Sequence, residues 1–426
     1  MAKLNFAKVT ILSGILTLLR LLCGFAISKV VAIYTGPVGI AGLGQLQNLV
    51  TFINGFVSSQ VSQGINRYSA ENKSDYDNAK YYWRAALKLS IVACLLIVCL
   101  GSIFSNNISM LLFSTNAYYW IVILALVVVP LNVINNIFLG VLNGLGDHYR
   151  FFIANGCAIV FSAITMTMLV YLFGLKGALI AAALNNAIAG LWLIFVVMKC
   201  DWFKYCYWVG KTTSFHIGEM RNYFFMGIIG ALTGPVSLIL VRTILTKDFS
   251  AEYAGYWQSV FKLSEAYLAV LTTALTVYYF PKTAAAKTVN EHISVLKTGS
   301  LIVIPFACVF AGGIFLGKEH ILRILFSGEF INAQKLFFFQ NLGDVFRITS
   351  WLFATILLAK GYFKINAMLE ITFSILFPLL TWIFIKYYSF KGVSIAYCIT
   401  YFGYLVVSIL IYIGHIKRLK KVNNAA

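Results

Sequence analysis

Residues 117–143 read AYYWIVILALVVVPLNVINNIFLGVLN, an apolar stretch without a charged side chain. A helix crosses the hydrocarbon core of a bilayer with about 20 apolar residues, so this stretch is long enough to span it. It is typical of the chain, because 60% of the 426 residues are hydrophobic and only 11% are charged. An ordinary soluble domain is about a quarter charged. The sequence therefore predicts an all-α, polytopic membrane protein and excludes a large soluble domain.

Apolar segments of similar length recur along the whole sequence, separated by polar residues, glycine or proline. We place them at residues 9–34, 38–66, 85–104, 117–143, 150–174, 177–198, 222–246, 253–281, 298–317, 333–359, 362–386 and 391–415. They predict about 12 transmembrane helices. The basic N-terminus is followed by an apolar stretch without a small-residue cleavage site, so we expect the first helix to be retained.

The net charge of +19 follows this predicted topology. If the N-terminus is cytoplasmic, that side of the membrane carries 20 Lys and Arg residues and the other side 8, with Arg242 among the 8. Cytoplasmic loops carry the excess of Lys and Arg, so we expect both termini in the cytoplasm. The basic residues form no groove with interleaved aromatics, and the eight cysteines lack metal or disulfide spacing. We therefore expect no nucleic-acid partner, no metal and no cofactor.

Two short motifs recur at nearly the same offset, which is about half the chain. The first opens the second predicted helix as Ala41-Gly42-x-x-Gln45 and the eighth as Ala254-Gly255-x-x-Gln258. The other opens the sixth as Lys176-Gly177-x-x-Ile180-Ala181 and the twelfth as Lys391-Gly392-x-x-Ile395-Ala396. Such a parallel repeat predicts two six-helix lobes related by a pseudo-twofold axis, with a substrate site between them. We place the lobes at residues 1–205 and 206–426, because the aromatic and basic link 199–221 is the natural boundary.

Ionisable side chains inside the apolar segments are the candidate functional residues: Arg20, Lys29, Lys88, Lys262, Glu265, Asp344, Arg347 and Glu370. A charge in hydrocarbon costs at least ~2.5 kcal/mol, so it usually faces a partner or a wet cavity. Lys88 lies only a turn inside its segment and is typical of an interfacial lysine. A spacing of three puts Lys262 and Glu265 on one helical face, and likewise Asp344 and Arg347. Each pair either neutralises itself or lines a shared polar cavity, together with Glu370.

The embedded charges favour an anionic ligand. Five cations against three carboxylates make the interior net positive, which suits a phosphate or pyrophosphate. We predict that the substrate-binding residues are Arg20, Lys29, Lys262 and Arg347, and that the ion-coupling or gating residues are Glu265, Asp344 and Glu370. Asn132, Asn136 and Asn143 share a helical face, where amides could bind sugar hydroxyls or form hydrogen bonds between helices.

Two motifs bear on enzymatic alternatives. The chain contains no G-x-x-x-x-G-K-[ST], so no phosphate loop for ATP is encoded and any pump is secondary. Asp75-Tyr76-Asp77 matches either the metal-binding carboxylates of sugar transferases or an ordinary solvated loop. The short loops leave no room for an extracytoplasmic catalytic domain.

Nearly the whole chain resembles the Wzx-type flippases, the polysaccharide transporter branch of the multidrug/oligosaccharidyl-lipid/polysaccharide exporter superfamily, and within it those for O-antigen and enterobacterial common antigen units. The motifs that carry the resemblance are Gly36-Pro37-x-Gly39, Trp257-Gln258, Glu265-Ala266-Tyr267-Leu268, Gly343-Asp344-Val345 and Ala359-Lys360. The resemblance implies a V-shaped pair of six-helix bundles with a cationic cavity. It matches Arg20, Lys29, Asp344 and Arg347 to family positions and puts Glu265 where the family has an acid, whereas Lys262 departs from the general pattern.

The resemblance also implies a function. It predicts a multi-pass protein of the bacterial inner membrane that moves an undecaprenyl-pyrophosphate-linked oligosaccharide from the cytoplasmic to the periplasmic leaflet. We expect an antiporter that uses protons or sodium and serves lipopolysaccharide biosynthesis, not an enzyme, with a polysaccharide polymerase and a chain-length regulator as further partners. The prenyl tail would stay in lipid at the seam between the lobes. The alternatives are a small-molecule or multidrug exporter of the same superfamily and a membrane glycan polymerase.

Overall fold

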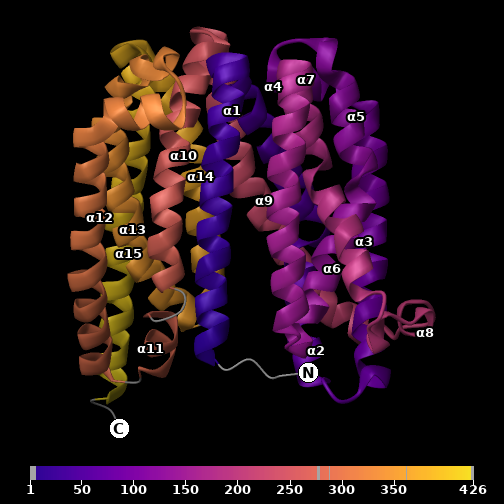
Figure 1. Ribbon diagram of the computed structural model, residues 1–426. Helices are drawn as coiled ribbons and strands as arrows, with labels where there is room; N and C mark the ends of the chain where they lie inside the picture. Colours follow the sequence, from indigo (N-terminus) through magenta and orange to yellow (C-terminus); the bar gives the residue numbers. More distant parts are fainter. Residues whose placement is uncertain (1–5, 276–278, 287, 361, 424–426) are drawn as a thin grey trace. The chain divides into compact units, whose positions relative to one another are not determined.

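The computed structural model describes residues 6–275, 279–286, 288–360 and 362–423, and every regular element in them is a helix (Figure 1). The elements are α1 (Phe6–Asn54), the π-helical turn η1 (Gly55–Ser59), α2 (Gln60–Glu71), α3 (Tyr76–Ile103), α4 (Ser105–Phe113), η2 (Asn116–Tyr118), α5 (Tyr119–Val127), α6 (Val129–Leu145), α7 (His148–Val197), η3 (Asp201–Phe203), α8 (Tyr205–Trp208), α9 (Ser214–Asp248), α10 (Ala251–Ala274), α11 (Phe280–Ala285), α12 (Val289–Leu325), η5 (Gly328–Leu336), α13 (Phe337–Ala359), α14 (Phe363–Tyr388), η6 (Ser389–Lys391) and α15 (Gly392–Asn423).

Eight helical stretches of the described residues are long and apolar enough to cross a membrane. Three of them, Ile11–Ser58, His148–Val197 and Lys364–Lys417, have 48, 50 and 54 residues. A straight helix of 48 residues would be about 72 Å long, more than twice the ~30 Å of the hydrocarbon core, so each of these must reverse. Each of the twelve predicted segments falls on a helix, although residues 276–278 of one lie outside the described residues. The prediction of an all-helical, multi-pass membrane protein is therefore confirmed.

Each reversal occurs at a residue whose backbone has a positive φ angle. Gly36 (φ 61°) interrupts α1, Gly174 (φ 55°) interrupts α7, and Ser389 (φ 51°) separates α14 from α15. A Cβ on Gly174 would meet no atom within 4 Å, so the glycine serves the left-handed backbone and not the packing. At two of the three reversals, glycine is therefore the residue that lets one long helix become two spans.

The repeated Lys-Gly motif has the same structural role in both halves. A Cβ on Gly177 would lie 1.8 Å from the carbonyl oxygen of Leu169, and a Cβ on Gly392 would lie 2.4 Å from that of Phe384. In each case the glycine packs on the backbone of the preceding helix, directly after a reversal. The recurrence of this turn at the same place in the two halves supports the internal duplication.

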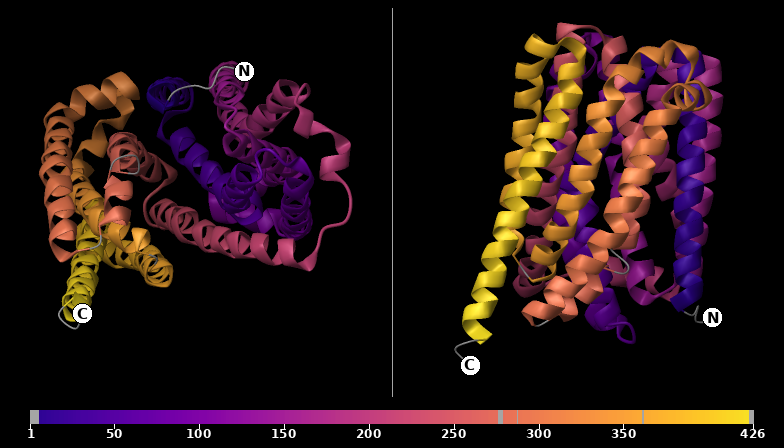
Figure 2. Two further views of the ribbon diagram at one scale, coloured as in Figure 1. Left: turned by 90° about the horizontal axis from the view of Figure 1, so that it is seen from below. Right: turned by 90° about the vertical axis from the view of Figure 1, so that its left-hand side faces the viewer.

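The chain forms two compact units, Met1–Ile239 and Leu240–Ala426, and the boundary between them falls inside α9. Viewed from below, many helices of each unit are seen end on, so each unit is a helix bundle (Figure 2). The lobe boundary after residue 205 stays a prediction. The first five and last three residues, which would carry the two termini, lie outside the described residues.

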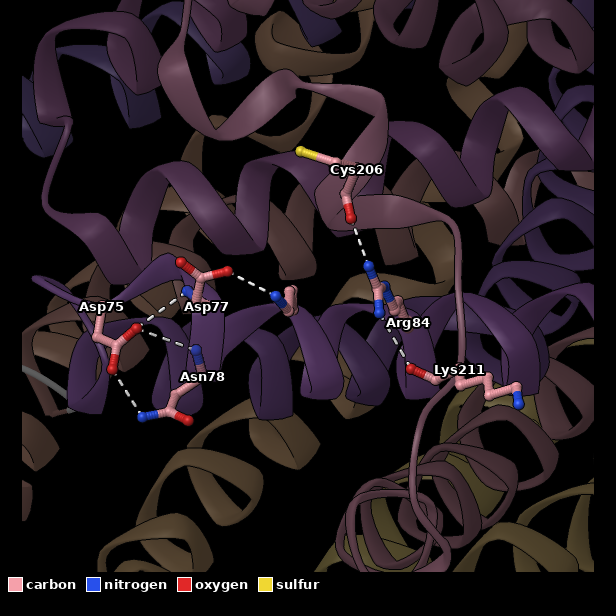
Figure 3. A network of polar contacts seen from close by, with 7 residues as sticks. Asp75, Asp77, Asn78, Arg84, Cys206 and Lys211 are labelled. Atoms are coloured by element: carbon pink, nitrogen blue, oxygen red, sulfur yellow. Dashed lines mark hydrogen bonds and ion pairs between the residues drawn. The ribbon is translucent and has the colours of Figure 1, made fainter.

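Asp75 and Asp77 are structural carboxylates at the start of α3 (Figure 3). The Asp75 carboxylate accepts the backbone N–H groups of Asp77 and Asn78 at 3.0 and 3.1 Å, which is an N-cap. The Asp77 carboxylate pairs with Lys80 at 2.5 Å. These bonds favour the solvated-loop interpretation over a metal-binding pair.

The link between α7 and α9 packs against α3. Arg84 of α3 donates to the carbonyl oxygens of Cys206 and Lys211, the latter at 3.1 Å (Figure 3). The ring of Trp208 stacks on buried Trp83 at 5.4 Å between centroids. These contacts hold the link on the first unit.

Candidate functional site

A buried carboxylate, Asp344 of α13, is at the centre of the polar network in the second unit. Its side chain is fully buried. Oδ2 accepts hydrogen bonds from the Ser264 hydroxyl at 2.6 Å and the Tyr267 hydroxyl at 2.7 Å, both on α10. Oδ1 accepts one from the Tyr397 hydroxyl of α15 at 2.7 Å. Asp344 thus ties three helices together through hydroxyl donors, and within the described residues it makes no direct ion pair.

Arg347, one turn after Asp344, makes its ion pair with another helix. The guanidinium donates to Glu265 of α10 and, through the same nitrogen, to the Tyr397 hydroxyl at 3.3 Å. It also lies 5.6 Å from the ring centroid of Trp351 and 5.3 Å from that of Tyr401, distances at which cation–π attraction operates. Residues three apart on one helix therefore do not pair with each other here. The ion pair instead joins Arg347 of α13 to Glu265 of α10.

The Arg347–Glu265 pair is buried at one end only. The Arg347 side chain is 14% exposed and that of Glu265 46%. The Glu265 carboxylate is thus only half enclosed by the second unit, in contrast to the fully buried Asp344. The ion pair therefore lies at the edge of the buried network and not in its centre.

Tyr397 joins the two charged groups. Its hydroxyl donates to Asp344 and accepts from Arg347, the two roles a phenol can fill at once. Glu370 of α14 lies further out, accepting from Tyr404 of α15 at the long distance of 3.5 Å. The structure thus brings Glu265, Asp344 and Arg347 into one network and leaves Glu370 at its edge.

The remaining predicted cations have no place in this network. Lys262 of α10 is half-buried and makes no hydrogen bond or ion pair in the part of the chain that the structure describes. In the first unit, Arg20 and Lys29 lie on α1, Arg20 exposed and Lys29 half-buried. Arg20 likewise has no polar partner among the described residues. Lys88 is exposed on α3, and its place at the membrane interface stays a prediction.

Of the asparagines of α6, Asn136 has one of the two uses that the sequence left open. The Asn136 amide donates to the Ser58 hydroxyl at 2.8 Å, and the Ser62 hydroxyl donates to the Asn136 backbone carbonyl at 2.6 Å. These are hydrogen bonds between helices. Buried Asn132 has an Oδ1 without a partner among the described residues, whereas Asn143 is exposed.

The second unit contains a buried arginine that the charge tally of the sequence had placed on the far side of the membrane. Arg242, placed on the far side in the charge tally, is 1% exposed, and its Nε donates to Gln258 at 2.7 Å. Its guanidinium lies 5.6 Å from the Trp257 ring centroid. Arg242 follows Lys29 by the same offset that separates Gln45 from Gln258. The repeat was therefore the signal that could have identified it.

The tyrosine hydroxyls were also missed. Tyr397, Tyr401 and Tyr404 recur at the spacing of one helical face of α15, and all three contact the network. Their spacing could have marked that face, but aromatic residues at helical spacing are far more often packing residues.

The chain resembles known proteins over most of its length. The model of a family described as "Polysaccharide biosynthesis protein" matches residues 6–286. The chain is 24% identical over 410 residues to the lipid III flippase of Escherichia coli (strain K12), covering 94% of this chain and 96% of that protein. The same figures hold for the lipid III flippase of Shigella flexneri.

Solved transporters share the fold. A multidrug resistance MATE family transporter of the MOP superfamily in an inward-facing conformation matches with a TM-score of 0.79 at 15% identity, over 94% of this chain and 96% of that one. An outward-facing conformation of such a transporter matches with a TM-score of 0.70 at 14% identity, over 98% of both chains. The chain therefore has the MATE transporter fold.

Proposed function

This chain belongs to the polysaccharide biosynthesis protein family, and from that premise we propose that it is a flippase for lipid-linked oligosaccharides. The family match and the lipid III flippase relatives confirm the resemblance to Wzx-type flippases that the sequence motifs indicated. The relatives are flippases and transporters, so the expectation of a transporter and not an enzyme is confirmed as well. The proposal extends to the substrate, the coupling ion and the orientation in the membrane.

The observation that carries the proposal is the presence of unpaired cations inside membrane-spanning helices. Lys262 and Arg20 have no anionic partner in the described residues. Keeping a cation in the span of a helix costs ~2.5–3.5 kcal/mol, a cost that an anionic ligand would offset. A pyrophosphate attached to a lipid is such an anion, and it reaches the helices from within the membrane.

We assign the finer roles as follows. Arg20, Lys29, Lys262 and Arg347 escort the pyrophosphate of an undecaprenyl-linked oligosaccharide of the O-antigen type. Arg347 exchanges Glu265 for the substrate, because the Glu265 side chain is half exposed and can move away. Asp344, Glu265 and Glu370 take up the coupling proton or sodium ion.

The Tyr397 hydroxyl would transmit that coupling. It contacts Asp344 and Arg347 together, so protonation of the carboxylate alters the hydrogen bond that the phenol offers to the guanidinium. Binding of an ion at Asp344 and of substrate at Arg347 would then be linked through one side chain.

The membrane arrangement completes the proposal. The excess of basic residues favours cytoplasmic termini in a bacterial inner membrane, with two six-helix lobes at residues 1–205 and 206–426 that alternate in access to the two leaflets. A polysaccharide polymerase and a chain-length regulator would act on the product.

The multidrug exporters that share the fold favour a second candidate, an exporter of small molecules. A carrier of cationic drugs needs unpaired acids in its spans, whereas Lys262 and Arg20 are cations without an anionic partner among the described residues. This difference favours the anionic lipid.

The experiment is flipping of a fluorescent undecaprenyl-pyrophosphate oligosaccharide in proteoliposomes. Lys262→Ala is the informative variant because Lys262 has no partner in the described residues whose loss would disturb folding. Loss of one charge-assisted contact, worth ~1.5–3 kcal/mol, predicts a fall in flipping of about tenfold or more. Lys262→Arg should restore activity, and Lys88→Ala is the matched control. Wild-type activity in Lys262→Ala would contradict the assigned role, and export of a cationic dye without lipid flipping would favour the second candidate.

A further inference from the structure

Two surface cavities, both largely open to the outside, lie between α1 and the first half of α7 in the first unit. The one nearer the start of α1, which we call the lower cavity, has a volume of about 320 Å³. It is lined by Leu19, Ile153, Gly156, Cys157, Val160 and Phe161. The other, of about 610 Å³, includes Val30 and Tyr34 of α1 with Ala163, Ile164, Met168 and Tyr171 of α7. Among the described residues, neither lining includes a charged side chain. Both linings are mainly apolar, with Thr167 the aliphatic hydroxyl in the larger one, which suits an apolar ligand.

The two cavities follow one line along the helix pair. The lower numbers of α1 meet the lower numbers of α7, and the higher numbers meet the higher, so the two helices run parallel here. From Leu19 to Tyr34 a helix rises about 22 Å, roughly three quarters of the hydrocarbon thickness. We call this line of two cavities the α1–α7 groove. Its length and direction match a hydrocarbon chain lying across a bilayer.

Small residues line part of the groove, and two aromatic rings lie at one end of it. A Cβ on Gly156 would meet only Cδ2 of Leu16, at the ordinary van der Waals distance of 3.7 Å. The rings of Tyr34 and Tyr171 meet edge to face at 5.8 Å between centroids. The groove therefore has an aromatic pair at one end and small residues along its wall, where a larger side chain would take up space.

Hydrophobicity alone cannot select an occupant, because the surrounding lipid is as apolar as the groove. Selection must come from shape and from a charged group held at a fixed position. Arg20 follows Leu19 of the groove and is exposed without a polar partner in the described part of the unit. Lys29 precedes Val30 of the second cavity. An anionic head group with a long apolar tail complements both features.

We infer that the α1–α7 groove holds the polyisoprenoid tail of the lipid-linked substrate while Arg20 contacts its pyrophosphate. The inference rests on the proposed function and deepens it. It differs from the expectation that the tail stays in lipid at a seam between the lobes, because both walls belong to the first unit. The groove would keep the tail in register with the head group during flipping.

The test compares two pyrophosphates of different tail length, undecaprenyl and geranyl, by binding to the full chain in phosphatidylcholine nanodiscs. Gly156→Leu and Ala163→Leu fill the groove, and Gly218→Leu adds the same side chain where no atom lies within 4 Å. We expect the wild type and Gly218→Leu to prefer the long tail by about five- to tenfold, and the groove variants to lose that preference. Unchanged preference in groove variants with wild-type helicity would overturn the inference.

Cys157 offers a readout that needs no variant. Cys157 lines the lower cavity, whereas Cys308 is exposed on α12 of the other unit. Undecaprenyl pyrophosphate should slow the reaction of Cys157 with N-ethylmaleimide and leave that of Cys308 unchanged. Equal protection of Cys157 by phosphatidylglycerol would overturn the inference in favour of ordinary lipid acyl chains. If the proposed function itself is wrong, the wild-type protein will not flip the oligosaccharide. That outcome is separate from the failure of the groove, which only the groove variants and Cys157 report.

Discussion

Replacing Tyr397 by phenylalanine tests the polar network most directly. The substitution removes one oxygen, leaves the ring in place and keeps its packing. The lost hydroxyl donates to Asp344 at 2.7 Å and accepts from Arg347 at 3.3 Å. Tyr397 is 1% exposed, so water cannot replace the hydroxyl without rearrangement. The network should therefore lose stability in proportion to these two bonds.

The size of the effect follows from the bonds. Side-chain hydrogen bonds between membrane helices average ~0.6 kcal/mol, and bonds to an ionised group are about twice as strong as neutral ones. The bond to Asp344 then contributes ~1.2 kcal/mol and the longer bond to Arg347 at most ~0.6 kcal/mol. We expect Tyr397→Phe to lower the free energy of unfolding by ~1.5–2 kcal/mol.

Tyr401→Phe is the matched control on the same helix. The Tyr401 ring contacts Arg347, but its hydroxyl makes no hydrogen bond within the described residues. Its loss should change stability by less than ~0.5 kcal/mol. Unfolding of the purified protein in mixed micelles measures both. Equal stability of the two variants would refute the network as described.

A double-mutant cycle then isolates the bond to the carboxylate. Tyr397→Phe and Asp344→Ala should be non-additive by ~1 kcal/mol, since the first removes the donor and the second the acceptor of the same bond. Additivity within ~0.3 kcal/mol would mean that the two side chains act independently.

The membrane part of the fold could be predicted because the bilayer imposes a simple rule. Each span must be apolar over about 20 residues, so apolar length located all twelve segments without knowledge of their packing. The reversals at Gly36 and Gly174 were also readable as breaks, because glycine is needed for the left-handed backbone there. Ser389 shows the limit of that signal, since a serine adopts the same type of backbone.

The pairing of the charges could not be predicted. A spacing of three establishes that Asp344 and Arg347 share a helical face, but which residue faces them depends on how α10 and α15 pack against α13. The sequence named Glu265, Asp344 and Arg347 as candidates for a shared polar region, but it gave no indication that Arg347 pairs with Glu265. The hydroxyl of Tyr397, which joins the two, carries no signal apart from its helical spacing.

Two further predictions test the packing and the topology. Gln258→Leu removes the acceptor of the hydrogen bond from buried Arg242 and should lower the free energy of unfolding by ~1–3 kcal/mol. Gln258→Glu keeps an acceptor and should lower it less. Equal losses would contradict the pairing. A membrane-impermeant maleimide should label exposed Cys206 in inverted vesicles and not in right-side-out spheroplasts, because the link carries the basic residues of the cytoplasmic side. Burial raises the pKa of the Cys200 thiol, so at neutral pH it stays protonated and should react far more slowly, which makes it the control. Labelling of Cys206 only from the outer face would reverse the predicted orientation of the whole chain, since the position of one link determines that of every span.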